Sequence, residues 1–212
     1  MSSGTKKMSE TCLVVGNGPS LAKIPNDFLA QYVTFGSNRC YLKFVPDYYA
    51  IIDTLWLQPY LGEVSKLDCQ KFIVTSLADR VSGAVPLHTR HTTQFSFQPL
   101  DWIYQGHTVT FVLLELAFYF GFEKVGLIGV DHRYSFDGEV GTKQTGRDIN
   151  HFSEDYYGKN DTWWRPDLKK TETAYAMAKE AFEKDGREII NITPNSALDI
   201  FPKENWEDWC IR

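Results

Sequence analysis

A chain of 212 residues is long enough for one domain with a sizeable buried core, and its 43% apolar content is typical of a globular protein. The net charge of −5 argues against a protein that coats nucleic acid, although it leaves room for a local basic pocket. No apolar run reaches the about 20 residues of a membrane span. The four cysteines show no metal-binding spacing and predict reduced thiols in a cytoplasmic protein. They are Cys12, Cys40, Cys69 and Cys210.

Residues 1–10 are polar and predict a flexible leader, so the folded domain is expected over residues 11–212. The domain opens with an apolar strand, Leu13–Val15, and a glycine turn. The turn comprises Gly16, Asn17, Gly18, Pro19 and Ser20. A helix is predicted from Leu21 to Tyr32. Pro25 is either tolerated near the start of this helix or divides it into two short turns.

This glycine turn predicts a phosphate site, because free N–H groups and the helix dipole at a helix start attract an anion. It matches neither common glycine loop. Leu21 stands where the dinucleotide-binding fingerprint has its third glycine, and the Gly-Lys-Ser/Thr of a P-loop is absent. The alternative is a tight strand-to-helix turn without a ligand.

The rest of the chain alternates strands with helices, which predicts an α/β fold: a single Rossmann-like domain whose mainly parallel sheet has helices on both faces. The further strands are predicted over residues 32–36, 47–52, 71–75, 124–130 and 187–192, and the further helices over 54–64, 108–121 and 167–186. Residues 77–106 predict an irregular connection with one short strand near Phe95.

Residues 132–166 form a long connection without periodicity, which predicts a lid or binding loop inserted into the domain. Its cationic and paired aromatic residues either cover a ligand or belong to a solvated loop pinned to the body. They are Arg147, Lys159, Arg165, Trp163 and Trp164.

Polar residues end almost every predicted strand, and ligands of open parallel sheets bind at that edge. These residues are Asn17, Asn38, Asp53, Ser76, Asp131, Thr193 and Asn195. They predict a polar crevice that binds a small molecule. The alternative is that these positions are polar only because turn residues are usually polar. Thr108 and Thr110 begin a second helix at the same edge. They are predicted either to contact a phosphate or to form an ordinary helix cap.

Asp131 and His132 end the central strand, where they could form an acid–base pair, a metal site or a salt-bridged loop start. His132 and His151 lie within or beside the lid and are the predicted catalytic histidines, and Asp131 is the third predicted catalytic residue. The other three histidines occupy irregular or cap positions and are set aside. They are His88, His91 and His107.

Several segments resemble the family named for the archaeal 6-hydroxymethylpterin diphosphokinase, the MptE-like family, which also occurs in surface-polysaccharide and flagellin-glycosylation proteins. The matching segments are Gly16–Leu21, Ser37–Arg39, Gly121–Tyr134, His151–Gly158, Gly186–Asn191 and Phe201–Pro202. The same skeleton is similar to bacterial single-domain sialyltransferases.

That resemblance implies roles for individual residues. Asn17 and Asn38 would lie along a cytidine nucleotide. The Pro-Asn-Ser segment near the last strand, with Asn195 and Ser196, belongs to the shared pattern and is expected to contact the nucleotide. The phosphate would meet lid tyrosines, and these are Tyr134, Tyr156 and Tyr157. Relatives often carry a histidine just after a lid tryptophan, where this chain has Trp164.

The leading hypothesis is a nucleotide-sugar-dependent glycosyltransferase with a cytidine monophosphate (CMP) sugar as donor and a glycan or small-molecule hydroxyl as acceptor, without a metal site. The alternative is an ATP-dependent diphosphokinase of a pterin-type alcohol, with Asp53 and Asp131 holding Mg²⁺. A third is a nucleotide- or sugar-binding protein without catalysis. No nucleic-acid partner is expected, and a homo-oligomer is left open.

Overall fold

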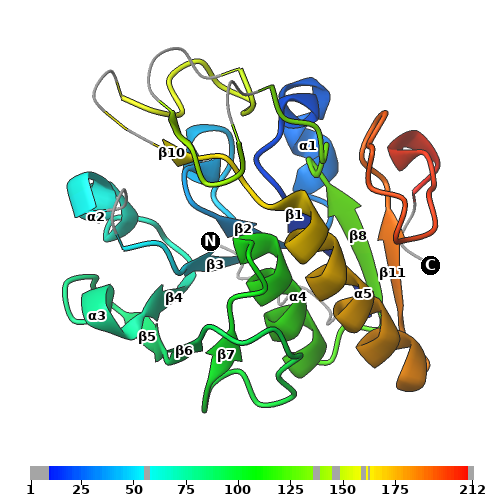
Figure 1. The fold of residues 1–212 in the computed structure, drawn as a ribbon, viewed down its shortest axis with the longest axis horizontal. Coiled ribbons are helices and arrows are strands. Elements are labelled where there is room, and N and C mark those ends of the chain that lie inside the picture. Colours follow the sequence, from blue (N-terminus) through cyan, green and yellow to red (C-terminus); the bar gives the residue numbers. More distant parts are fainter. Residues whose placement is uncertain are drawn as a thin grey trace, which may run out of the picture.

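A computed structural model describes residues 10–54, 58–135, 139–144, 149–158, 161 and 163–209 (Figure 1). Its centre is a seven-stranded sheet of order β11-β8-β1-β2-β3-β4-β5, in which all neighbouring strands are parallel. The strands are β1 (Thr11–Val15), β2 (Val33–Ser37), β3 (Tyr48–Ile51), β4 (Gln70–Val74), β5 (Ala84–Leu87), β8 (Lys124–Ile128) and β11 (Glu188–Asn191). The predicted Rossmann-like α/β fold is confirmed.

Helices cover both faces of this sheet. The long helices α4 (Val109–Tyr119) and α5 (Leu168–Lys184) lie side by side on one face (Figure 1). Short helices cover the other face, and they are η1 (Pro19–Lys23), α1 (Asn26–Leu29), η2 (Cys40–Leu42), η3 (Gln58–Tyr60), α2 (Leu61–Val64) and α3 (Thr75–Ala78). Strand β1 is buried on both sides, because alternate residues of a strand point to opposite faces.

The order of the strands places a crevice beside β1. From β1 the chain builds β2 to β5 outward in one direction, and then returns to place β8 and β11 on the other side of β1. Such a reversal leaves a gap between the connections that leave the two neighbouring strands, and ligands of open parallel sheets bind there. The loops after β1 and β8 therefore flank the expected binding site.

Several predicted elements differ from the structure. Of the helix predicted over residues 54–64, the described part holds only η3 and α2, and residues 55–57 lie outside the described ranges. The predicted helix after the glycine turn is divided into η1 and α1 at Pro25, whose missing N–H cannot continue a helix. The strand predicted near Phe95 is wrong, since the irregular region instead holds β5, β6 (Thr89–Arg90) and β7 (Ile103–Tyr104). Strand β5 contains Pro86, which an edge strand tolerates because one side needs no ladder hydrogen bonds.

The described part of the lid contains a short antiparallel hairpin of β9 (Lys143–Gln144) and β10 (Trp163–Trp164). Of the predicted leader, only residue 10 is described. Cys12, Cys40 and Cys69 are free thiols, whereas Cys210 lies outside the described residues. Within the described ranges, no helix is both long and apolar enough to cross a membrane.

Candidate functional site

Two cavities lie at the carboxyl edge of the sheet. The smaller cavity, of about 110 Å³, is lined by the loops after β1 and β8 and by the starts of α4 and α5. The larger cavity, of about 780 Å³, is lined by the loop after β3, the turn before α4 and the β9–β10 hairpin. Small-molecule sites usually have roughly 300–1,000 Å³. Only the larger cavity can therefore hold most of a nucleotide or sugar, while the smaller one suits a group of the size of a phosphate.

The two glycines of the first turn serve close packing between two chain segments. The Gly16 N–H donates to the Ile128 carbonyl at 2.7 Å, and the Gly18 N–H donates to the Gly129 carbonyl at 2.8 Å. A Cβ on Gly16 would lie only 2.5 Å from the Gly129 carbonyl oxygen. Because both N–H groups already have acceptors, the phosphate-binding role predicted for Gly16 and Gly18 is not supported by this geometry.

Asp131 occupies the anion position at the start of η1. Its carboxylate accepts hydrogen bonds from the Ser20 N–H at 3.1 Å and from the Ser20 hydroxyl at 2.7 Å. A phosphate would have to displace this carboxylate, so the phosphate prediction at Ser20 is corrected to a contact within the fold. Pro19 and Ser20 line neither cavity, although Asp131 borders the smaller one. Asp131 holds the loops after β1 and β8 together.

Asn17 lines the smaller cavity, as predicted for a ligand-binding asparagine. Its side-chain N–H donates to the Ser37 carbonyl at 3.2 Å, and its backbone carbonyl accepts from the Phe152 N–H at 3.0 Å. In the described part of the chain, its buried side-chain oxygen has no hydrogen-bond donor. An unpaired acceptor suits a hydroxyl or amino group of a ligand better than a phosphate.

The turn before α4 faces both cavities, at the sheet edge where the sequence predicted the start of this helix. Gly106 and His107 both have positive φ, at 55° and 61°. The Thr108 N–H donates to the Gln105 carbonyl at 3.1 Å, and the Thr108 hydroxyl oxygen accepts from the Thr110 N–H at 3.3 Å. Both threonines line the smaller cavity and Thr108 also lines the larger one, so the cap prediction is confirmed and the phosphate role stays a prediction.

Unusual backbone conformations gather at the smaller cavity. Four described residues other than glycine have positive φ, and they are Asn38, His107, His132 and Asn195. The first three line the smaller cavity. Such conformations cost of order 1–3 kcal/mol each and concentrate at functional sites. Their position supports the identification of this crevice as the functional site.

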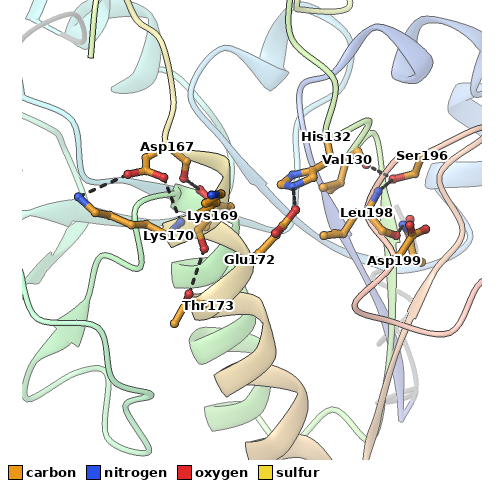
Figure 2. Close-up of polar contacts among 12 residues, drawn as sticks. Val130, His132, Asp167, Lys169, Lys170, Glu172, Thr173, Ser196, Leu198 and Asp199 are labelled. Atoms are coloured by element: carbon orange, nitrogen blue, oxygen red, sulfur yellow. Dashed lines mark hydrogen bonds and ion pairs between the residues drawn. The ribbon is translucent and has the colours of Figure 1, made fainter. Parts of the chain in front are cut away.

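The two predicted catalytic histidines both line the smaller cavity but are held differently. His132 is buried, and its Nε2 lies 3.0 Å from the carboxylate of Glu172 on α5 (Figure 2). The His151 ring stacks on Tyr156, with centroids 3.9 Å apart. His107, which was set aside, lines both cavities. The only sequence signal for it was its place directly before the capping threonine.

The predicted phosphate-binding tyrosines separate into three environments. Tyr134 borders the smaller cavity, whereas Tyr157 borders the larger one and stacks on Trp163 with centroids 4.4 Å apart. Tyr156 is fully buried and lines neither cavity, so the structure does not support its contact with a phosphate. Burial raises the pKa of Tyr156 and of Tyr175, a wall residue of the smaller cavity, so both hydroxyls stay protonated.

Asn195 and Ser196 lie behind the site and not in it. The Ser196 hydroxyl donates to the Val130 carbonyl at 2.6 Å (Figure 2). The Ala197 N–H donates to the Asp131 carbonyl at 2.9 Å. Neither Asn195 nor Ser196 lines a cavity. Their contacts support the loop after β8, and the nucleotide-binding role predicted for them stays a prediction that this geometry does not support.

The lid is anchored by Arg39, a role that the sequence did not reveal. Its guanidinium donates to the carbonyls of Asp155 at 2.6 Å and Tyr156 at 2.8 Å, and it lies 4.2 Å from the centre of the Tyr60 ring. Of the cationic lid residues predicted to cover a ligand, Arg147 and Lys159 lie outside the described residues, and Arg165 lines neither cavity. Lys143 instead lines the larger cavity.

The acidic pair predicted to hold Mg²⁺ under the diphosphokinase hypothesis is not brought together. Asp53 follows β3 and borders the larger cavity, whereas Asp131 follows β8 and bonds Ser20. Their strands are three places apart in the sheet, which is about 14 Å at the usual strand spacing. Among the described side chains, no group of three or more His, Cys, Asp or Glu could hold a metal ion. Ser76 lines neither cavity.

No protein-family model matches the sequence, and no curated protein matches it either. A solved structure, that of the MAf glycosyltransferase from Magnetospirillum magneticum AMB-1, is similar over 99% of this chain, with a TM-score of 0.62 and 14% sequence identity. This chain spans 35% of the length of that chain. The likeness shows that the α/β fold described above also occurs in part of a glycosyltransferase.

Proposed function

We propose that this protein transfers a sugar from a nucleotide-activated donor to a hydroxyl group. The observation that carries the proposal is the pair of adjoining cavities of unequal size at the place where the strand order reverses. A transferase of this kind must hold a phosphate leaving group and a bulky acceptor side by side. The fold likeness to a glycosyltransferase supports the same proposal.

The smaller cavity would take the phosphate that leaves with the nucleotide. Its wall carries Arg133 and three histidines, His107, His132 and His151, beside the N-terminal end of α4. The Arg133 cation and a helix start stabilise the negative charge that develops on a departing phosphate. The only acidic residue of the described wall, Asp131, has its charge directed to Ser20.

The larger cavity would take the nucleoside and the acceptor. Its wall contains the stacked pair of Tyr157 and Trp163, together with the half-exposed ring of Trp164. Flat aromatic faces suit nucleobases and the apolar faces of sugar rings. A CMP-sugar is the proposed donor, because a single phosphate matches the small size of the neighbouring cavity and because Asn17 offers an acceptor to a ligand amino or hydroxyl group.

A thermal-shift and calorimetric screen tests this function. CMP, CMP-N-acetylneuraminate, UDP-N-acetylglucosamine and ATP are each added with and without Mg²⁺. A ligand present at a hundred times its dissociation constant stabilises the native protein by about 2.7 kcal/mol. We expect a cytidine nucleotide to raise the unfolding temperature without metal, and CMP release from the sugar donor to require an acceptor such as lactose. Absence of binding by every nucleotide would refute the proposal.

The same screen separates the other hypotheses. Binding of ATP alone, with turnover of a pterin alcohol that a chelator abolishes, would support the diphosphokinase. Binding of a nucleotide without turnover of any donor would support a binding protein without catalysis, which the tryptophan at position 164 suggests from the sequence. Membership of the MptE-like family remains a prediction.

A further inference from the structure

The two cavities share one wall. Four described residues line both cavities, and they are Asn38, His107, Thr108 and Val109. In a transfer between a group in one cavity and a group in the other, the bond that breaks and the bond that forms lie beside this shared wall. Of the four, His107 alone has a side chain that can accept a proton near neutral pH.

The turn that carries His107 is fixed. The backbone at His107 is left-handed, with φ of 61°, and the preceding Gly106 also has positive φ. A side chain at Gly106 would collide with the Phe111 ring, so α4 packs directly against the turn. The Thr108 N–H closes the turn on the Gln105 carbonyl. The imidazole itself is exposed and available to a substrate.

A carboxylate lies within electrostatic range of His107. Asp167 caps α5, and the hydrogen bond from the Lys170 N–H is the main cause that lowers the pKa of Asp167. A positive charge on His107 lowers that pKa further. Asp167 is therefore close enough to His107 for the two side chains to interact electrostatically. Two more acidic residues, Asp53 and Asp161, and the cation of Lys143 border the larger cavity beside it.

We propose that His107 is the general base of the transfer, an assignment that rests on the proposed function. The His107 imidazole takes the proton of the acceptor hydroxyl as its oxygen forms a bond to the anomeric carbon of the donor sugar. The bond between that carbon and the phosphate oxygen breaks, and its electron pair leaves with the nucleotide. The proton on His107 then passes to solvent.

His132 and His151 are placed less well for this step. Each lines the smaller cavity alone, on the side of the leaving group. The Nε2 of His132 is already directed to Glu172, and the ring face of His151 is covered by Tyr156. Their position suits contact with the phosphate. The sequence-based assignment of one of them as the base stays a prediction that the same experiment tests.

The test measures binding and turnover separately. In His107→Asn the base is lost but the left-handed backbone is retained, since asparagine adopts this conformation readily. We expect the dissociation constant for CMP to change less than threefold, while the rate of acceptor-dependent CMP release falls by about 10²–10⁴-fold. His88→Asn is the matched control, because His88 is an exposed histidine that lines neither cavity.

Chemical rescue gives a second readout. In His107→Gly the missing ring leaves space beside an exposed turn, and glycine tolerates positive φ. Added imidazole should restore part of the rate in this variant but none in His132→Gly or His151→Gly. Full turnover by His107→Asn would overturn the assignment while the proposed transferase stands. A wild-type protein that binds no nucleotide would overturn the transferase, and the role of His107 with it.

Discussion

Two turns at the same edge of the sheet differ in what their groups contact. The turn after β1 has two glycines and a serine, and its N–H groups at Gly16, Gly18 and Ser20 all bind acceptors within the fold. The turn before α4 has one glycine, yet it borders both cavities and carries an exposed histidine. The glycines of the first turn therefore mark a close approach of two backbones, whereas the second turn presents side chains to both cavities.

The comparison teaches that a glycine turn has to be assessed by where its donors point. At the first turn, Gly129 and Asp131 of the loop after β8 occupy the space and accept the N–H hydrogen bonds that a phosphate would use. The second turn borders open space on its outer side, because the two cavities begin there. Three stability measurements can break or sharpen this contrast.

The largest effect is expected at the contact between the first turn and β8. Gly129 has φ of 73°, and a Cβ there would lie 2.6 Å from the Gly16 carbonyl oxygen. Gly129→Ala should lower the free energy of unfolding by about 2–5 kcal/mol, from overpacking and left-handed strain. Urea denaturation measures this loss in the free energy of unfolding. Gly62→Ala is the control, since a Cβ at Gly62 meets nothing within 4 Å and should leave stability unchanged or slightly raised.

If Gly129→Ala were as stable as the wild type, the two segments would not be in close contact. The first turn would then be free to open toward a ligand, and the contrast between the turns would fail. A loss of stability with retained CMP binding would instead support a purely structural role for this contact.

The next effect concerns α4, which carries the second turn. Glu115 is fully buried, its carboxylate accepts from the Ser96 N–H at 2.6 Å, and burial raises its pKa from 4.5 to about 9. The folded protein thus keeps a proton that the unfolded chain releases above about pH 4.5. Stability should be full below that pH and fall as the pH rises toward 9.

Glu115→Gln removes this titration while keeping an oxygen for Ser96. The variant should match the wild type at pH 4.5 and be more stable by about 3 kcal/mol at pH 7, at 1.36 kcal/mol per pH unit. Unfolding free energies measured between pH 4.5 and pH 9 check the growing gap. Parallel curves for the two proteins would show that the carboxyl is not held neutral in the fold.

The smallest effect is expected at the anion position of the first turn. Asp131→Asn weakens two charge-assisted hydrogen bonds to Ser20 and should cost about 1–2 kcal/mol. Ser20→Ala removes one of them. If the carboxylate serves the fold, the double variant will lose less than the sum of the single losses, by about 1 kcal/mol in a double-mutant cycle. Strict additivity would mean that Asp131 is directed elsewhere.

The sequence predicted those helices and strands that are specified by residues within the element itself. The predicted strand over 124–130 and the helices over 108–121 and 167–186 correspond to β8, α4 and α5. Apolar periodicity, a capping Thr108 and Asp167, and glycines at positive φ after each helix identify them. Strand β5 was missed because it contains a proline, which usually argues against a strand. The proline is tolerated because β5 is an edge strand that pairs on one side only.

The sequence predicted where the candidate site lies but only some of the residues that line it. Asn17, Asn38 and Asp131 do meet at one cavity, as expected from strand ends in a parallel sheet. Their contacts were not predictable. The N–H groups of Gly16, Gly18 and Ser20 each bind an acceptor more than a hundred positions away.

The sequence by itself determined the alternation of strands and helices, the edge of the sheet that carries the polar residues and the position of the glycine turn, since all three follow from periodicity and backbone preference within short segments. The tertiary structure alone decided that the N–H groups of the first turn bind acceptors within the fold, that Tyr156 and Ser196 are buried, and that His107 borders both cavities. Occupied donors and shared cavity walls are relations between segments that only folding brings together.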